Sequence, residues 1–331
     1  MSGMRRREFI TLLGGAAVGW PLAAQAQQPS KIYRVGLLTN GPVMGSTDER
    51  RTTLLSVLAA RGFVDGQNLN LVQRSADAHP ERLDGLAAEL KAANVDVIIT
   101  FGYPAALAAK VSAKNVPIVV TGAGDPVATG LVDGMARPGS NITGVSELST
   151  ELSAKRLEIL KDALPNLGRV AMLWNAADLG MTLRYRAAAD ATHVLGIKVQ
   201  ALGVREPDDF DNAFAEMTRE RPDAILMVND ALTALNRKRV VEFAKTNHLP
   251  TIFENGAPVR DGGLMSYGPK QSEIGERAAN LLARILGGKR PADLPLELPT
   301  HFEFIINLKT AQALGLMLPP TLLARADKVI E

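Results

Sequence analysis

Short, almost continuous apolar runs alternate along this chain with longer stretches in which apolar residues recur at helical spacing. The runs VDVIITF (95–101) and VPIVVTG (116–122), for example, flank the amphipathic stretch PAALAAKVSAKN (104–115). Strands that are apolar on both sides are typical of parallel sheets covered by helices on both faces. The pattern therefore predicts an α/β protein built from doubly wound parallel sheets.

The alternation restarts once, which predicts two lobes of similar size. The first series ends with the strand NITGVSE (141–147), and the second begins with the helix LSAKRLEILKDALP (152–165), so the boundary falls near residues 144–149. The strand and helix elements after residue 261 are too few for a third domain, and we expect them to cross back between the lobes. For the tail after residue 308 we expect a short helix, a Pro-Pro stop and a final helical turn.

The first 26 residues have the pattern of an export signal. Arginines at 5–7 precede an apolar stretch at 12–20, which is too short to span a bilayer, and residues 24–26 form a small-x-small cleavage site. The arginines ahead of residues 9–10 resemble a twin-arginine signal, and an arginine-rich secretory signal is the alternative. Either interpretation predicts cleavage of residues 1–26 and a periplasmic mature protein.

Charge and cysteine content narrow the possible partners of the mature chain. Removing the arginines at 5–7 and Glu8 reduces Lys+Arg from 37 to 34 and Asp+Glu from 35 to 34, a net charge of zero. Such a chain has no electrostatic feature that favours nucleic acid or an anionic membrane. It contains no cysteine, which excludes disulfides, thiol nucleophiles, Cys-based zinc sites and a lipid anchor on cysteine. We therefore expect a soluble protein without a lipid anchor.

The glycine-rich segment at 121–144 raises the question of a phosphate-binding loop. A dinucleotide fingerprint needs a third glycine three residues after Gly124, where Val127 stands, and Pro126 interrupts the turn. The chain has no G-x-S-x-G nucleophile motif, and its four histidines have no partner at i, i+4. We therefore expect no catalytic residue, no cofactor and no metal.

Polar and small residues cluster where the predicted strands end. In open parallel sheets, ligands bind at the carboxyl ends of the strands. Glycines there allow a ligand to approach the backbone, exposed helix N–H groups suit a carboxylate, and Asp178, Asp230 and Glu254 could neutralise an ammonium group. The alternative is that these residues only form turns. The ligand-binding residues predicted in this way are Asn40, Gly41, Gly102, Tyr103, Thr121, Gly122, Asp125, Asn175, Asp178, Asn229, Asp230 and Glu254.

Four blocks of sequence carry a family resemblance that spans the mature chain. They are GDPVATGLV (124–132), RPGSNITGVS (137–146), LWNAAD (173–178) and INLKTAQALGLMLPPTLLARAD (306–327). With them the chain resembles periplasmic substrate-binding proteins of ABC importers that are often labelled tryptophan/tyrosine transport components. Trp174 and Asp178 stand where relatives commonly show Tyr and Glu, a departure that keeps an acid at the same spacing.

The resemblance implies a type I periplasmic-binding-protein fold, in which three crossing segments join two lobes that clamp a ligand. The lobes would comprise residues 32–146 with about 269–298, and 147–268 with about 299–331. Such a protein is not an enzyme. It would bind a small molecule, such as an amino acid or small aromatic compound, as a monomer and deliver it to an ABC permease with its ATPase.

Within the implied clamp, Tyr103 is the preferred residue for stacking on a ligand ring. Trp174 and Phe253 lie inside apolar strands, where core packing is expected instead. Two other functions remain open at this stage: a periplasmic ligand sensor of the same fold that signals through a membrane receptor, and an exported α/β hydrolase.

Overall fold

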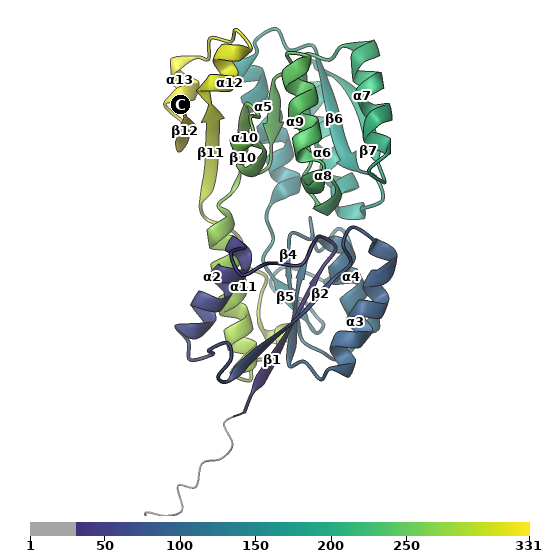
Figure 1. The fold of residues 1–331 in the computed structure, drawn as a ribbon, viewed down its shortest axis with the longest axis vertical. Helices are drawn as coiled ribbons and strands as arrows, with labels where there is room; N and C mark the ends of the chain where they lie inside the picture. Colours follow the sequence, from purple (N-terminus) through teal and green to yellow (C-terminus); the bar gives the residue numbers. More distant parts are fainter. Residues whose placement is uncertain (1–30) are drawn as a thin grey trace, which may run out of the picture. The chain divides into compact units, whose positions relative to one another are not determined.

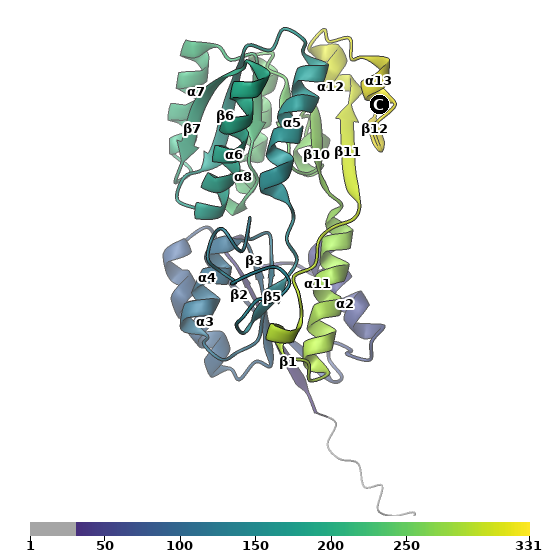
Figure 2. The same ribbon diagram turned by 180° about the vertical axis from the view of Figure 1, so that it is seen from behind.

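The structure is a computed structural model that describes residues 31–331, of which Tyr33–Glu331 form one compact unit. The predicted export signal, residues 1–26, lies outside the described residues. Two sheets organise this unit: a five-stranded sheet in the order β2-β1-β3-β4-β5, and a seven-stranded sheet in the order β12-β11-β10-β9-β8-β6-β7. Each sheet has helices on both faces, which defines two lobes (Figures 1 and 2).

The first lobe contains the five-stranded sheet, in which all paired strands are parallel. Its strands are β1 (Tyr33–Thr39), β2 (Leu69–Ser75), β3 (Val97–Phe101), β4 (Ile118–Thr121) and β5 (Ile142–Gly144). One face is covered by α3 (Leu83–Ala92) and α4 (Tyr103–Ser112), and the other by α2 (Glu49–Ala59) and α11 (Gln271–Leu286). Two 3-10 turns, η1 (Pro80–Arg82) and η2 (Pro291–Asp293), complete this lobe.

The second lobe contains the seven-stranded sheet. Its strands are β6 (Arg169–Asn175), β7 (Lys198–Val204), β8 (Ala224–Met227), β9 (Thr251–Phe253), β10 (Met265–Pro269), β11 (Phe302–Asn307) and β12 (Lys328–Ile330). One face is covered by α5 (Ser149–Ala163), α6 (Leu179–Leu195), α12 (Leu308–Ala313) and α13 (Pro320–Leu323). The other is covered by α7 (Asp209–Glu220), α8 (Ala231–Leu235), α9 (Arg237–Thr246) and α10 (Ala257–Arg260).

Two details differ from the predicted pattern. β10 and β11 pair antiparallel, whereas the other strands of this sheet pair in parallel. In the tail, α12 and α13 are the expected helix and helical turn, but residues 328–330 add β12 alongside β11. Three residues are too few to show the alternation that identifies a strand.

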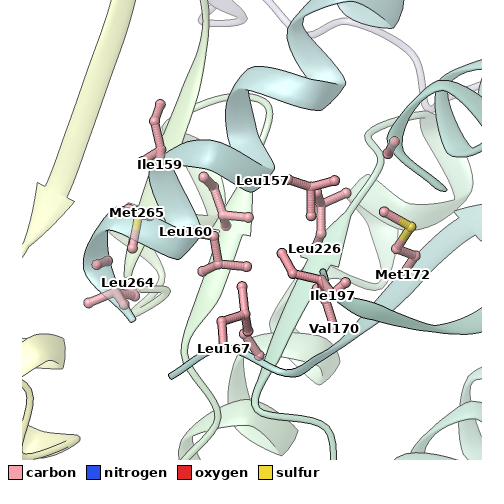
Figure 3. Packing of buried hydrophobic residues seen from close by; sticks show 14 of the residues in the cluster. Leu157, Ile159, Leu160, Leu167, Val170, Met172, Ile197, Leu226, Leu264 and Met265 are labelled. Carbon is pink, nitrogen blue, oxygen red and sulfur yellow. The ribbon is translucent and has the colours of Figure 1, made fainter. Parts of the chain in front are cut away.

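Helix α5 shows how the predicted periodicity forms the core of the second lobe (Figure 3). Leu157 and Leu160 lie about one helical turn apart and are fully buried. They belong to the same core cluster as Val170 and Met172, which are two residues apart in β6 and therefore point to the same face of the sheet. Burying one such leucine stabilises the fold by roughly 1.5–3 kcal/mol. The apolar residues that predicted helix α5 from their spacing are therefore the residues that pack in the core.

Three segments connect the lobes: residues 145–148 between β5 and α5, Lys270 between β10 and α11, and residues 294–301 between η2 and β11. Glu273, in the first turn of α11, accepts hydrogen bonds from the Thr300 hydroxyl at 2.7 Å and from the His301 backbone N–H at 2.9 Å. Burial acts to raise the pKa of Glu273, but hydrogen bonds from Thr300 and Arg277 outweigh it and lower the pKa to about 2. The ionised carboxylate of Glu273 therefore connects two of the three interlobe segments, the one at Lys270 and the one at residues 294–301.

Candidate ligand-binding site

A cavity of about 320 Å³ lies between the two lobes and is lined by the carboxyl ends of strands from both. It is within the size range of small-molecule pockets. Nine of the twelve residues predicted from strand ends line this cavity: Asn40, Gly41, Gly102, Thr121, Gly122, Asp178, Asn229, Asp230 and Glu254. The two facing sheets therefore bring most of the predicted set to one place.

Three predicted residues do not line the cavity. The side chain of Asp125 caps its own turn, because its Oδ1 accepts hydrogen bonds from the N–H groups of Val127 and Ala128, each at 3.0 Å. Asn175 supports a neighbour, since its Nδ2 donates to Oδ2 of Asp230 at 2.7 Å. Tyr103 begins α4 beside the cavity, but it is not part of the wall on which a ligand ring would stack.

Glu254 lines the cavity, but its charge is already compensated by two buried arginines. Its Oε1 lies 3.1 Å from Nη1 of Arg156, and its Oε2 lies 2.6 Å from Nη1 of Arg184. Both arginines are at most 1 % exposed. Arg156 also donates from Nε to the carbonyl oxygen of Tyr267 at 2.7 Å. Its carboxylate holds the arginines of α5 and α6 beside the end of β9, and its neutralisation of a ligand ammonium group stays a prediction.

Asp178 and Asp230 form a second acidic group, and neither is paired with a base. Asp178 caps α6 by accepting from the N–H of Met181 at 3.2 Å, and Asp230 caps α8 by accepting from the N–H of Thr233 at 2.9 Å. Across the described residues, no Lys, Arg or His nitrogen lies within 4.0 Å of either carboxylate. Burial and the nearby charge of Asp230 raise the pKa of Asp178 to about 6. This pair can therefore receive a cation from a ligand.

Glu147 is a cavity residue that the strand-end reasoning overlooked. It lies in the first crossing segment, after β5, and its Oε2 is 3.7 Å from Nη2 of Arg184. Burial raises the pKa of Glu147, although the charge of Arg184 opposes the change. Because β5 ends at Gly144 and the acid follows three residues later, the same rule applied to this strand would have found it.

On the first lobe, Asn40 lines the cavity, and its buried side-chain oxygen is an unused acceptor. Its side chain is 7 % exposed, and its Oδ1 has no hydrogen-bond partner in the structure. Because leaving a buried polar atom unsatisfied costs free energy, a ligand that donates a hydrogen bond here would be favoured.

The apolar part of the wall comes from helix faces that strand ends do not reveal. Leu54 of α2, Ile274 and Ala278 of α11, and Met181 of α6 line the cavity. Their helical spacing predicts burial but does not distinguish a cavity wall from a packed core.

Phe101 is the aromatic residue of the cavity wall, and its ring centroid lies 5.5 Å from the guanidinium carbon of Arg50. Trp174 and Phe253 are 8 % and 1 % exposed, which confirms the expected core packing. Trp174 stacks on Tyr185 with ring centroids 3.7 Å apart.

Two α/β lobes whose strand ends converge on a polar cavity define the class of two-lobed ligand-binding proteins. The chain belongs to the ABC transporter substrate binding protein family, whose model matches residues 42–330. No helix within residues 31–331 is long and apolar enough to cross a membrane.

Individual relatives cover nearly the same part of the chain. A "Tyrosine-binding protein" of Clostridioides difficile is 25% identical over 272 residues, which are 82% of this chain and 78% of the relative. A conserved domain protein of Vibrio cholerae is 27% identical, with a TM-score of 0.85 over 90% of this chain and 100% of its own. An ABC domain from Streptococcus pneumoniae in complex with L-Trp is 24% identical, with a TM-score of 0.83 over 90% and 99%. These similarities confirm the type I periplasmic-binding-protein fold.

Proposed function

We propose that this chain is the exported substrate-binding protein of an ABC importer, and that it clamps an amino acid between its lobes. The observation that carries the proposal is the pair Asp178 and Asp230, which lines the interlobe cavity and, among the described residues, forms no salt bridge with a base. The names of two relatives, one described as tyrosine-binding and one solved with L-Trp, support the same ligand class.

The cavity offers a partner for each part of an amino acid. The α-ammonium group matches Asp178 and Asp230 in the second lobe. The α-carboxylate matches the side of the cavity formed by Gly102 and Pro104 at the start of α4, where the helix dipole favours an anion. The side chain matches the apolar wall around Leu54, Ile274 and Phe101. A ligand held in this way contacts both lobes, which is the condition for a ligand to drive closure.

Export, delivery and assembly state are further parts of the proposal. The mature chain would act in the periplasm as a monomer and hand its ligand to a membrane permease driven by a cytoplasmic ATPase. Replacing both Arg6 and Arg7 by lysine tests the export route. Periplasmic accumulation should be lost if the twin-arginine pathway is used, and retained if the signal is an ordinary secretory one.

The binding test uses mature protein, residues 27–331, in a thermal-shift and calorimetric screen. L-tyrosine and L-tryptophan are compared with tyramine, which lacks the carboxylate, and with 3-(4-hydroxyphenyl)propionate, which lacks the ammonium group. A ligand at 100 times its dissociation constant adds about 2.7 kcal/mol to the free energy of unfolding. We expect stabilisation by an amino acid and none by the propionate. Equal stabilisation by the propionate would contradict the role of the two aspartates.

A further inference from the structure

Beside the cavity, the two lobes touch backbone to backbone. Gly124 follows β4 in the first lobe, and Gly180 is the second residue of α6 in the second lobe. A Cβ atom placed on Gly124 would lie 3.1 Å from Cα of Gly180. A Cβ atom placed on Gly180 would lie 3.2 Å from the carbonyl oxygen of Ala123. A side chain at either glycine would therefore be closer to the backbone of the other lobe than ordinary van der Waals contact, and that backbone would have to shift by a few tenths of an ångström.

This contact is adjacent to the proposed ligand site but separate from it. Neither glycine lines the cavity. Asp178 lies two residues before Gly180, and its Oδ1 would be 3.2 Å from a Cβ at position 180. The Cβ atom of Tyr103 would lie 3.4 Å from the same added Cβ atom at position 180. The tyrosine expected to stack on a ligand thus packs at the contact between the lobes.

We propose that Gly124 and Gly180 are positioning residues that determine ligand affinity without touching the ligand. Their missing side chains let the lobes approach until Asn40 of the first lobe and Asp178 of the second reach one small molecule. A side chain at either position holds the lobes apart, so a ligand bound to one lobe cannot reach its partners on the other. This inference rests on the proposed function for its ligand, although the closure itself can be measured without one.

Two features separate this role from ordinary tight packing. The contact of Gly124 with Gly180, and that of Gly180 with the Ala123 oxygen, join different lobes, whereas Asp178 Oδ1 near position 180 belongs to the same lobe as Gly180. Gly124→Ala is therefore the substitution that tests the interlobe contact without approaching Asp178. The chain also contains a matched control for each glycine. Gly130 has φ +72°, close to the +73° of Gly124, and Gly85 lies in helix α3, but an added Cβ meets nothing within 4 Å at either control position.

The test compares Gly180→Ala with Gly85→Ala, and Gly124→Ala with Gly130→Ala, using L-tyrosine and L-tryptophan as calorimetric probes. We expect the two contact variants to bind the probe about tenfold or more weakly than their controls, because overpacked contacts resist closure. The ligand-free unfolding temperature of Gly180→Ala should equal that of wild type or exceed it. Equal dissociation constants within each matched pair would overturn the proposal.

A second measurement follows the lobes directly and separates this proposal from the choice of ligand. Because the chain has no cysteine, spin labels can be attached at Lys114→Cys and Lys238→Cys, which are exposed positions on opposite lobes. The distribution of distances between the two spin labels is then measured by double electron–electron resonance, with and without L-tyrosine or L-tryptophan. We expect the shorter-distance population to be depleted in Gly180→Ala and kept in Gly85→Ala, even if the wild type binds neither amino acid. Identical distributions in the two variants would overturn the proposal.

Discussion

Replacing Asp178 by asparagine should make the ligand-free protein more stable while weakening ligand binding. The side chain is 2 % exposed and faces Asp230, and burial together with that charge raises its pKa from 3.8 to about 6. The ionised form is thus less favourable in the folded protein than in the unfolded chain. Asparagine removes the charge, keeps the size and still caps the helix.

The magnitude and its pH dependence follow from linkage. Between pH 3.8 and about 6 the folded protein binds more protons at this site than the unfolded chain, so wild-type stability falls as pH rises through this window. The difference between about 6 and 3.8, at about 1.36 kcal/mol for each pKa unit, corresponds to about 3 kcal/mol above pH 6. For the mature chain, this is about 5 °C in melting temperature.

The assay is thermal unfolding of wild type, Asp178→Asn and Asp190→Asn from pH 4 to pH 8. Asp190 is exposed on the same helix and controls for the loss of one negative charge. We expect Asp178→Asn to melt above wild type at pH 7.5, and the two curves to converge towards pH 4. A variant that melts below wild type at pH 7.5, or a difference independent of pH, would refute a destabilised carboxylate at this site.

Three further substitutions test other parts of the structure. Glu254→Gln should cost about 3 kcal/mol or more in urea unfolding, because Arg156 and Arg184 lose their buried counter-charge; a loss below about 1 kcal/mol would contradict this. Glu273→Gln should lower the free energy of unfolding by about 1–3 kcal/mol at pH 7. This difference should shrink as the pH falls from 4.5 towards 2, because the wild-type carboxylate is then protonated. A difference that does not change with pH would count against this role of Glu273. Asn40→Ala should weaken calorimetric binding of L-tyrosine about tenfold, with little change in melting temperature; unchanged binding would remove Asn40 from the site.

Much of the fold follows from the sequence because strand and helix periodicities are local. Apolar runs such as residues 95–101 and 169–175 identify buried strands, and the restart after residue 147 separates the two series. The antiparallel pairing of β10 with β11 and the edge strand β12 depend on contacts between segments distant in sequence. Local pattern carries no information about such pairings.

The candidate site was predictable where it lies at strand ends and unpredictable where side chains pair across the fold. Asn40, Asp178 and Asp230 follow their strands directly and reach the cavity. The neutralisation of Glu254 by arginines of α5 and α6 depends on residues 70 and 98 positions away in sequence. The Cβ atom of Tyr103 lies next to the backbone contact between the lobes, and stacking of its ring on a ligand stays a prediction.

Calorimetry of mature wild type with L-tyrosine and L-tryptophan, repeated with one variant from each lobe, tests the central claim most directly. The proposed clamp predicts one ligand per chain for at least one of the two amino acids, and weaker binding in both Asn40→Ala and Asp178→Asn. It also predicts that wild-type affinity falls as pH is lowered below about 6, where Asp178 becomes protonated. Binding that depends on only one lobe would contradict the clamp, and no binding of either amino acid would contradict an aromatic amino acid as its ligand.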